Sequence, residues 1–210
     1  MINFAAIVIL FFSIVVHEYF HGYVALKCGD ETAKYAGRLT FNPIPHIDIF
    51  GTIILPLFLV LSGSSFLIGW AKPVPVNPYN FRNPGIDGVK VAAAGPLSNL
   101  SLAVAFSILT IIIANVFPFL LPSLNYALQW GILINLYLAV FNLIPVHPLD
   151  GSHILHYFLP YDMKVAYSKI QNYGFLILLL IIMTPLFGII HSIVNVLLNI
   201  LYFFINMFLF

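Results

Sequence analysis

The chain has 210 residues, of which 61% are hydrophobic and only 7% charged, and its formal net charge is +1. A soluble domain carries roughly 25% charged residues, so these polar groups are too few to cover a water-soluble surface. The eight basic residues are scattered through apolar sequence, which excludes a nucleic-acid-binding face. The composition predicts one integral membrane domain over residues 1–210, with the lipid bilayer as its surroundings and no nucleic-acid partner.

Long uncharged runs divide the chain into candidate membrane spans. A helix needs about 20 apolar residues to cross roughly 30 Å of hydrocarbon. No Asp, Glu, Lys or Arg occurs between Lys90 and Asp150, or from Ile170 to the end, and Pro118 and Pro122 divide the first of these runs. The sequence thus predicts an all-α polytopic membrane protein with five or six transmembrane helices. The expected crossings lie near 2–27, 93–117, 125–146, 172–188 and 190–210.

The uncharged run 51–71 is ambiguous, because Pro56 and the stretch 62–65 interrupt a crossing helix. If the run crosses, three basic residues fall on one side of the membrane and five on the other; if it returns, all eight lie on one face. The positive-inside rule favours the second arrangement. We therefore expect a re-entrant or surface-lying segment in a multi-pass protein of the cell membrane. The N-terminus would lie outside, and the C-terminus and the basic loops in the cytoplasm.

Two segments between the first crossing and Lys90 have the composition of extended chain. They are residues 37–43 and 70–76, and the prolines of the second restrict it to an edge strand. We expect a few short β-strands at the membrane surface. An open strand edge there can bind an extended peptide by strand addition.

The sequence His17-Glu18-Tyr19-Phe20-His21 is the strongest chemical signal in the chain. Helical residues four apart share a face, so the two imidazoles can hold one metal ion. Glu18 lies at the adjacent edge, where it can take a proton from the attacking water. Zinc fits, because catalytic zinc typically has three protein ligands and an open position for water. The alternative is a cluster of snorkelling histidines. An unpaired ionisable group in a membrane helix costs at least ~2.5 kcal/mol, which favours the metal.

Asp150 is the expected third ligand, because it alone among the seven acids lies at the mouth of a long apolar run. The two histidines lie 6 and 10 residues before Lys27, which is roughly 9–15 Å along a helix. With 51–71 re-entrant, the helices 2–27 and 125–146 run in the same direction and bring Asp150 to that depth. The alternative for this residue is a plain loop turn.

Three short motifs occur in order along the chain: HEYFH at 17–21, GPLSN at 95–99 and LDG at 149–151. Together they resemble the site-2 protease family of intramembrane zinc metalloproteases. The likeness covers almost the whole chain and is closest to compact members without PDZ or CBS domains. The resemblance implies one Zn²⁺ per chain, a catalytic acid/base at Glu18, and transmembrane proteins or peptides as substrates. The metal ligands that it implies are His17, His21 and Asp150.

Two further polar residues have roles that the sequence leaves open. Asn99 lies at about the depth of the metal, where its amide can bind the developing oxyanion as a catalytic group or form an interhelical hydrogen bond. His147 stands where the family commonly has proline, and His153 where it commonly has a basic residue. His147 can reach the metal or support a ligand, but a position in solvent is favoured.

These features predict an intramembrane zinc metalloendopeptidase that hydrolyses peptide bonds of transmembrane or membrane-associated substrates, with Glu18 as general acid and base. The first alternative is a membrane transporter or metal-handling protein that uses intramembrane His and Asp, against which the sequence has no visible inverted repeat. A catalytically silent protein that retains membrane clients is the second. The substrate, the cut site and the oligomeric state, including a homo-oligomer, are left open.

Overall fold

The computed structural model describes residues 4–62 and 69–208, and within them the chain is helical and forms no strand. The polytopic all-α expectation is therefore confirmed, whereas the expected surface strands are not found. The α-helices are α1 (Phe4–Lys27), α2 (Thr32–Tyr35), α3 (Leu55–Leu61), α4 (Pro84–Val116), α5 (Leu121–Asn142), α6 (Asp150–Phe158), α7 (Tyr161–Gln171), α8 (Gly174–Met183) and α9 (Phe187–Phe208).

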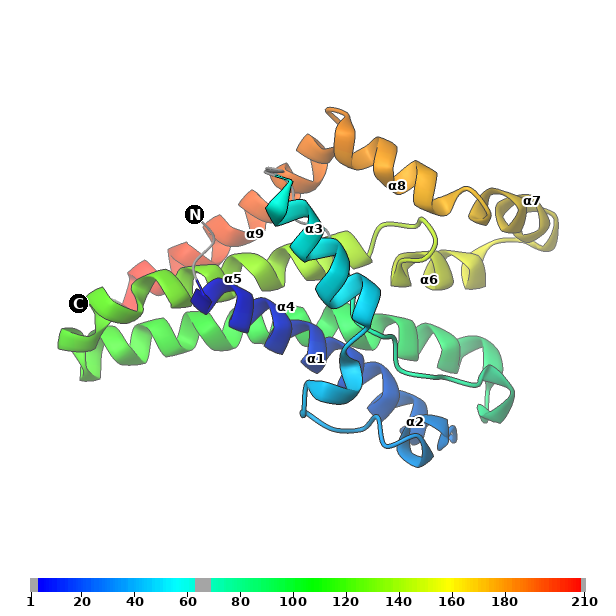
Figure 1. Ribbon diagram of the computed structural model, residues 1–210, viewed down its shortest axis with the longest axis horizontal. Helices are drawn as coiled ribbons and strands as arrows, with labels where there is room; N and C mark the ends of the chain where they lie inside the picture. The colour runs from blue at the N-terminus through cyan, green and yellow to red at the C-terminus, as the bar shows by residue number, and fades with distance from the viewer. Residues whose placement is uncertain (1–3, 63–68, 209–210) are drawn as a thin grey trace.

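Four of the described helices are long and apolar enough to cross a membrane: α1, α4, α5 with the short turn before it, and α9. Helix α4 packs along α1 and α5, and α9 packs along α5 and α4. In Figure 1, α1 and α5 run toward the end of the bundle that holds α6, while α4 and α9 run away from it. The parallel course of α1 and α5 agrees with the direction expected from the sequence.

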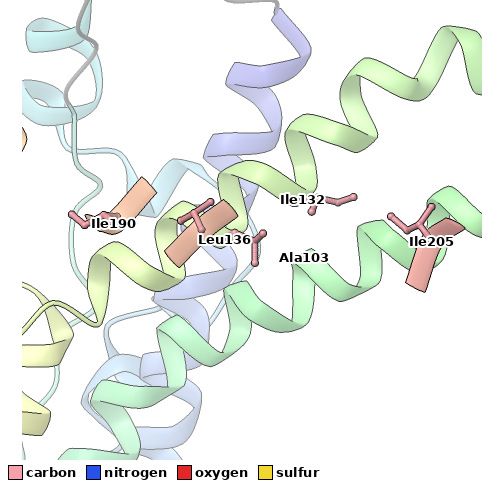
Figure 2. Packing of buried hydrophobic residues seen from close by; sticks show 6 residues of the cluster. Ala103, Ile132, Leu136, Ile190 and Ile205 are labelled. Carbon is pink, nitrogen blue, oxygen red and sulfur yellow. The ribbon is translucent and has the colours of Figure 1, made fainter. Parts of the chain in front are cut away.

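The apolar core of the bundle lies between α4, α5 and α9. Figure 2 shows Ala103 of α4, Ile132 and Leu136 of α5, and Ile190 and Ile205 of α9 within this layer. Ala103 and Ile132 are fully buried. A small residue such as Ala103 lets two helix backbones approach closely, which matters because lipid is as apolar as the core and packing must hold the helices together.

The crossing expected at 172–188 is wrong as a single span. Helix α8 has only 10 residues, about 15 Å, which is half the thickness of the hydrocarbon. It ends at Met183, two residues before Pro185, which lacks an N–H group, and it forms a 72° bend with α7. The described helices therefore offer four crossings, or five if α7 and α8 together form a broken span.

The next feature is the position of the C-terminal end of α9. The Nδ2 atom of Asn115, near the end of α4, donates a hydrogen bond to the carbonyl of Phe208 at 2.9 Å. The segments that carry the basic residues, including α2, the start of α4 and α7, lie at the opposite end of the bundle in Figure 1. The C-terminal end of α9 therefore lies beside the end of α4 and away from these basic segments. The side of the membrane that each end faces stays a prediction.

The run 51–71 returns to the place where it began. The Trp70 N–H donates to the carbonyl of Gly51 at 3.1 Å, and the Thr52 hydroxyl donates to the carbonyl of Trp70 at 2.8 Å. Helix α3 lies between these two ends, and residues 63–68 of the run lie outside the described residues. The hydrogen-bonded ends favour a segment that dips and returns over one that crosses. Its entry into the lipid stays a prediction.

Residues 70–76, which we call the strap, are extended but have no strand partner among the described residues. Their backbone groups are bonded one at a time: the Lys72 N–H donates to the carbonyl of His46 at 2.9 Å, and the Lys72 carbonyl accepts from Arg38 at 2.7 Å. Pro73 and Pro75 have no N–H to contribute to a ladder. The other predicted strand, 37–43, consists of turns and bends.

Asp30 anchors the chain that follows the strap to the end of α1. Its carboxylate is fully buried and accepts hydrogen bonds from the Thr32 hydroxyl at 2.5 Å, the Asn77 N–H at 2.7 Å and the Asn80 amide at 2.8 Å. Burial raises the pKa of Asp30, but these donors outweigh burial and hold the pKa of its carboxyl below its ordinary value. The strap is thereby fixed against the helix that carries His17 and His21.

Candidate metal centre

Three polar side chains from α1 and α6 converge inside the bundle. The Nε2 atoms of His17 and His21 lie 3.0 Å apart. The Asp150 carboxylate oxygens lie 3.2 Å from Nε2 of His17 and 3.3 Å from Nε2 of His21. Both histidines are buried. Within the described ranges 4–62 and 69–208, no other three His, Cys, Asp or Glu side chains lie close enough to share a metal ion.

Hydrogen bonds on the far side of each ring determine which nitrogen faces the cluster. Nδ1 of His21 lies 2.7 Å from the carbonyl of Val91, which can only accept, so Nδ1 carries the proton and Nε2 has a lone pair. Nδ1 of His17 lies 2.7 Å from Oδ1 of Asn99. The Asn99 Nδ2 atom donates to the Ser13 carbonyl at 3.3 Å, which leaves Oδ1 to accept from His17. Both Nε2 lone pairs therefore point at Asp150.

The residues present fit a zinc ion. Two nitrogen lone pairs and a carboxylate that face one another at about 3 Å repel unless a cation lies among them. The Oδ2 atom of Asp150 is buried and has no hydrogen-bond partner among the described residues. Two imidazoles and one carboxylate, with room for a fourth ligand, form a donor set that is common in catalytic zinc sites.

Two glycines make the space for this cluster. A Cβ atom on Gly95 of α4 would lie 2.4 Å from Nε2 of His21 and 2.5 Å from Nε2 of His17. A Cβ atom on Gly151 would lie 2.2 Å from the carbonyl oxygen of Leu143. The first glycine lets α4 pass beside the imidazoles, and the second lets the start of α6 approach the end of α5. Both glycines belong to motifs that the sequence singles out, but this steric role follows only from the packing of the helices.

Buried amides connect α1, α4 and α5 behind the histidines. Asn99 and Asn135 are both fully buried. Nδ2 of Asn99 donates to Oδ1 of Asn135 at 2.9 Å, and Nδ2 of Asn135 donates to the Ser13 hydroxyl at 2.9 Å. Because both amide hydrogens of Asn99 are engaged, the geometry favours the interhelical role over the oxyanion role. Asn135 was missed, although an amide in the middle of the run 125–146 is a signal for such a bond.

Glu18 lies beside the cluster and is held by the strap. Its Oε2 atom accepts a hydrogen bond from the Val74 N–H at 2.7 Å. Glu18 and the three converging side chains line one cavity of about 760 Å³, together with Pro73 and Val74 of the strap. The carboxylate therefore faces the space in which a reacting group would lie, without joining the ligand cluster.

His147 takes no part in the ligand cluster. It is exposed, and its ring lies 6.3 Å from the ring of His153, centroid to centroid. This arrangement favours the interpretation of His147 as a loop residue in solvent.

Residues 120–185 match the sequence profile of peptidase family M50. The chain is also 40% identical over 184 residues to "Putative zinc metalloprotease YwhC" of Bacillus subtilis (strain 168), a match that covers 86% of this chain and 80% of that protein. The chain belongs to peptidase family M50. Membership in this family confirms the resemblance to the site-2 proteases.

Two other relatives are longer proteins that are also named putative zinc metalloproteases. The chain is 29% identical over 178 residues to "Putative zinc metalloprotease Rip2" of Mycolicibacterium smegmatis, and 35% identical over 146 residues to "Putative zinc metalloprotease MJ0611" of Methanocaldococcus jannaschii. It spans 64% and 63% of these two proteins. No solved structure matches the chain. As a member of M50 with several apolar helices of spanning length, the protein is a multi-pass membrane zinc metalloprotease.

Proposed function

We propose that the protein is an intramembrane-cleaving metalloendopeptidase that binds one Zn²⁺ per chain through His17, His21 and Asp150. Its substrates are transmembrane or membrane-associated proteins. The observation that carries this proposal is the convergence of three ligand atoms within 4.8 Å of one another in a bundle of membrane-spanning helices. Zinc, when bound, supplies a Lewis acid that lowers the pKa of water to about 7 and polarises the carbonyl of the peptide bond.

Glu18 is the general acid and base in this proposal. It is adjacent to His17 on α1 and lines the same cavity, so it can take the proton of the attacking water and return it to the leaving amine. The hydrogen bond from Val74 holds one of its oxygens and so orients the carboxylate. The strap beside it is extended, and an unwound substrate segment can bind along it through main-chain hydrogen bonds.

Replacing Glu18 with glutamine tests this function. The three ligands stay intact in Glu18→Gln, so we expect bound zinc near one per chain and cleavage slowed by at least about a hundredfold. The measurement uses purified protein in neutral lipid vesicles with a synthetic transmembrane peptide, whose fragments are identified by mass spectrometry. Equal cleavage rates for this variant and the parent protein would contradict the proposed function.

Asn99 is a positioning residue in this proposal, because its Oδ1 atom accepts from Nδ1 of His17 and directs the opposite nitrogen toward the metal. Loss of such a support typically weakens metal affinity by about 10- to 100-fold. We therefore expect a weaker zinc dissociation constant for Asn99→Ala in a competition assay with a fluorescent chelator. The control Asn125→Ala removes an exposed amide of α5 and should leave zinc affinity unchanged. An oxyanion role would instead lower kcat at unchanged zinc affinity.

A further inference from the structure

The cavity that contains the metal ligands has a second group of polar side chains. His153 and His156 follow Asp150 by three and six residues on α6, so they lie roughly one and two turns further along that helix. Both line the cavity, as does Lys164 of α7. Glu18 and Asp150 are the only acidic side chains among the described residues that line it. Negative charge is therefore confined to the metal end of the cavity.

Lys164 lies close to His156, the histidine that is farther from the metal ligands. The ring of Tyr167 lies 6.3 Å from the ring of His156, centroid to centroid. Tyr167 follows Lys164 by three residues, so the two share the face of α7 that is turned toward α6. Six residues of helix span about 9 Å. His156 and Lys164 therefore mark a basic end of the cavity, about 9 Å along α6 from the ligand Asp150.

The ammonium group of Lys164 has no partner among the described residues. It is partly buried, yet it forms no hydrogen bond or ion pair there, whereas Lys34 and Lys90 pair with Glu31 and Asp87. A lysine ammonium that lines a cavity without a partner is available to bind an anionic group that enters the cavity.

We propose that His153, His156 and Lys164 form a substrate subsite that binds a carboxylate about three residues from the cleaved peptide bond. The spacing follows from about 9 Å of cavity divided by roughly 3.3 Å for each residue of an extended chain. Lys164 supplies the charge, and the imidazoles supply N–H donors. The carboxylate belongs either to an acidic side chain or to the free C-terminus of a substrate that has already been cut. The subsite rests on the proposed function, because the metal end defines where the peptide bond lies.

Paired substrates test this subsite. After the cut position is mapped in a transmembrane peptide, one pair of peptides carries Glu or Gln three residues from it. A second pair ends at that position with a free or an amidated C-terminus. We expect the parent protein to have a kcat/KM about tenfold higher for the carboxylate member of one pair, the value of one charge-assisted hydrogen bond. The pair that shows this preference identifies the source of the carboxylate.

Lys164→Gln should abolish the preference, so that kcat/KM becomes equal for the two members of the pair. The control Lys169→Gln removes an exposed lysine of the same helix that does not line the cavity, and it should retain the preference. A preference that survives Lys164→Gln, an equal loss on all peptides, or no preference in the parent protein would overturn the subsite alone. Cleavage that survives Glu18→Gln would instead overturn the proposed function and the subsite with it.

Discussion

Asp150→Asn is expected to reduce bound zinc to about a tenth of the parent value or less and to slow peptide cleavage by about a thousandfold or more. Asp150 supplies the only carboxylate of the ligand cluster, and its two oxygens lie 3.2 and 3.3 Å from the two Nε2 atoms. Asparagine has a similar size but no charge, so a divalent cation loses its only anionic ligand. The Lewis acid is worth several kcal/mol in the transition state, which corresponds to the thousandfold figure.

Metal analysis of the purified variant and cleavage of the same transmembrane peptide measure the two effects. The control is Asp162→Asn, which makes the same chemical change at an exposed acid of α7 outside the ligand cluster. It should keep both zinc and activity. If Asp150→Asn bound zinc as tightly as the parent protein, Asp150 would not be a ligand, and the convergence of α1 and α6 would serve packing alone.

The local part of the site was predictable from the sequence, because it depends on helix geometry. His17 and His21 share a face through their spacing of four residues, and no tertiary information is needed for that. Predicting that Asp150 lies beside the two histidines required a count of the crossings, and of their directions, between two distant segments. That count held as far as α5, and the structure brings Asp150 to the two histidines. Beyond Asp150 the count depends on helix length, and the expected single crossing at 172–188 is not found because α8 alone is too short to cross.

Contacts that depend on close packing were not predictable. The hydrogen bond from the Val74 N–H to Glu18 joins residues 56 positions apart and follows from how the strap lies on α1. Expecting a strand in 70–76 was reasonable from its extended composition, but strand formation needs a neighbouring strand, and none of the described residues provides one. The orientation of the Asn99 amide likewise depends on Asn135 and Ser13, which lie on two other helices.

Gly95→Ala is expected to abolish zinc binding and to slow cleavage by about a thousandfold or more, although it adds only one methyl group. The added Cβ would lie 2.4 Å from Nε2 of His21 and 2.5 Å from Nε2 of His17, closer than non-bonded atoms approach. Neither ring can retreat freely, because each is hydrogen-bonded on its far side, to Val91 and to Asn99. Overpacking of this kind also costs about 1–3 kcal/mol of stability, so we expect a lower unfolding temperature.

Gly88→Ala is the matched control for this prediction. It lies two turns earlier on α4, and a Cβ atom there would meet nothing within 4 Å. Replacing glycine by alanine inside a helix normally stabilises it by roughly 0.5–1 kcal/mol, so this variant should retain zinc and unfold at an equal or higher temperature. Metal analysis and thermal unfolding in detergent compare the two variants directly. Full zinc occupancy in Gly95→Ala would mean that α4 does not pass against the imidazoles, so the close packing of α1 on α4 at this glycine would be wrong.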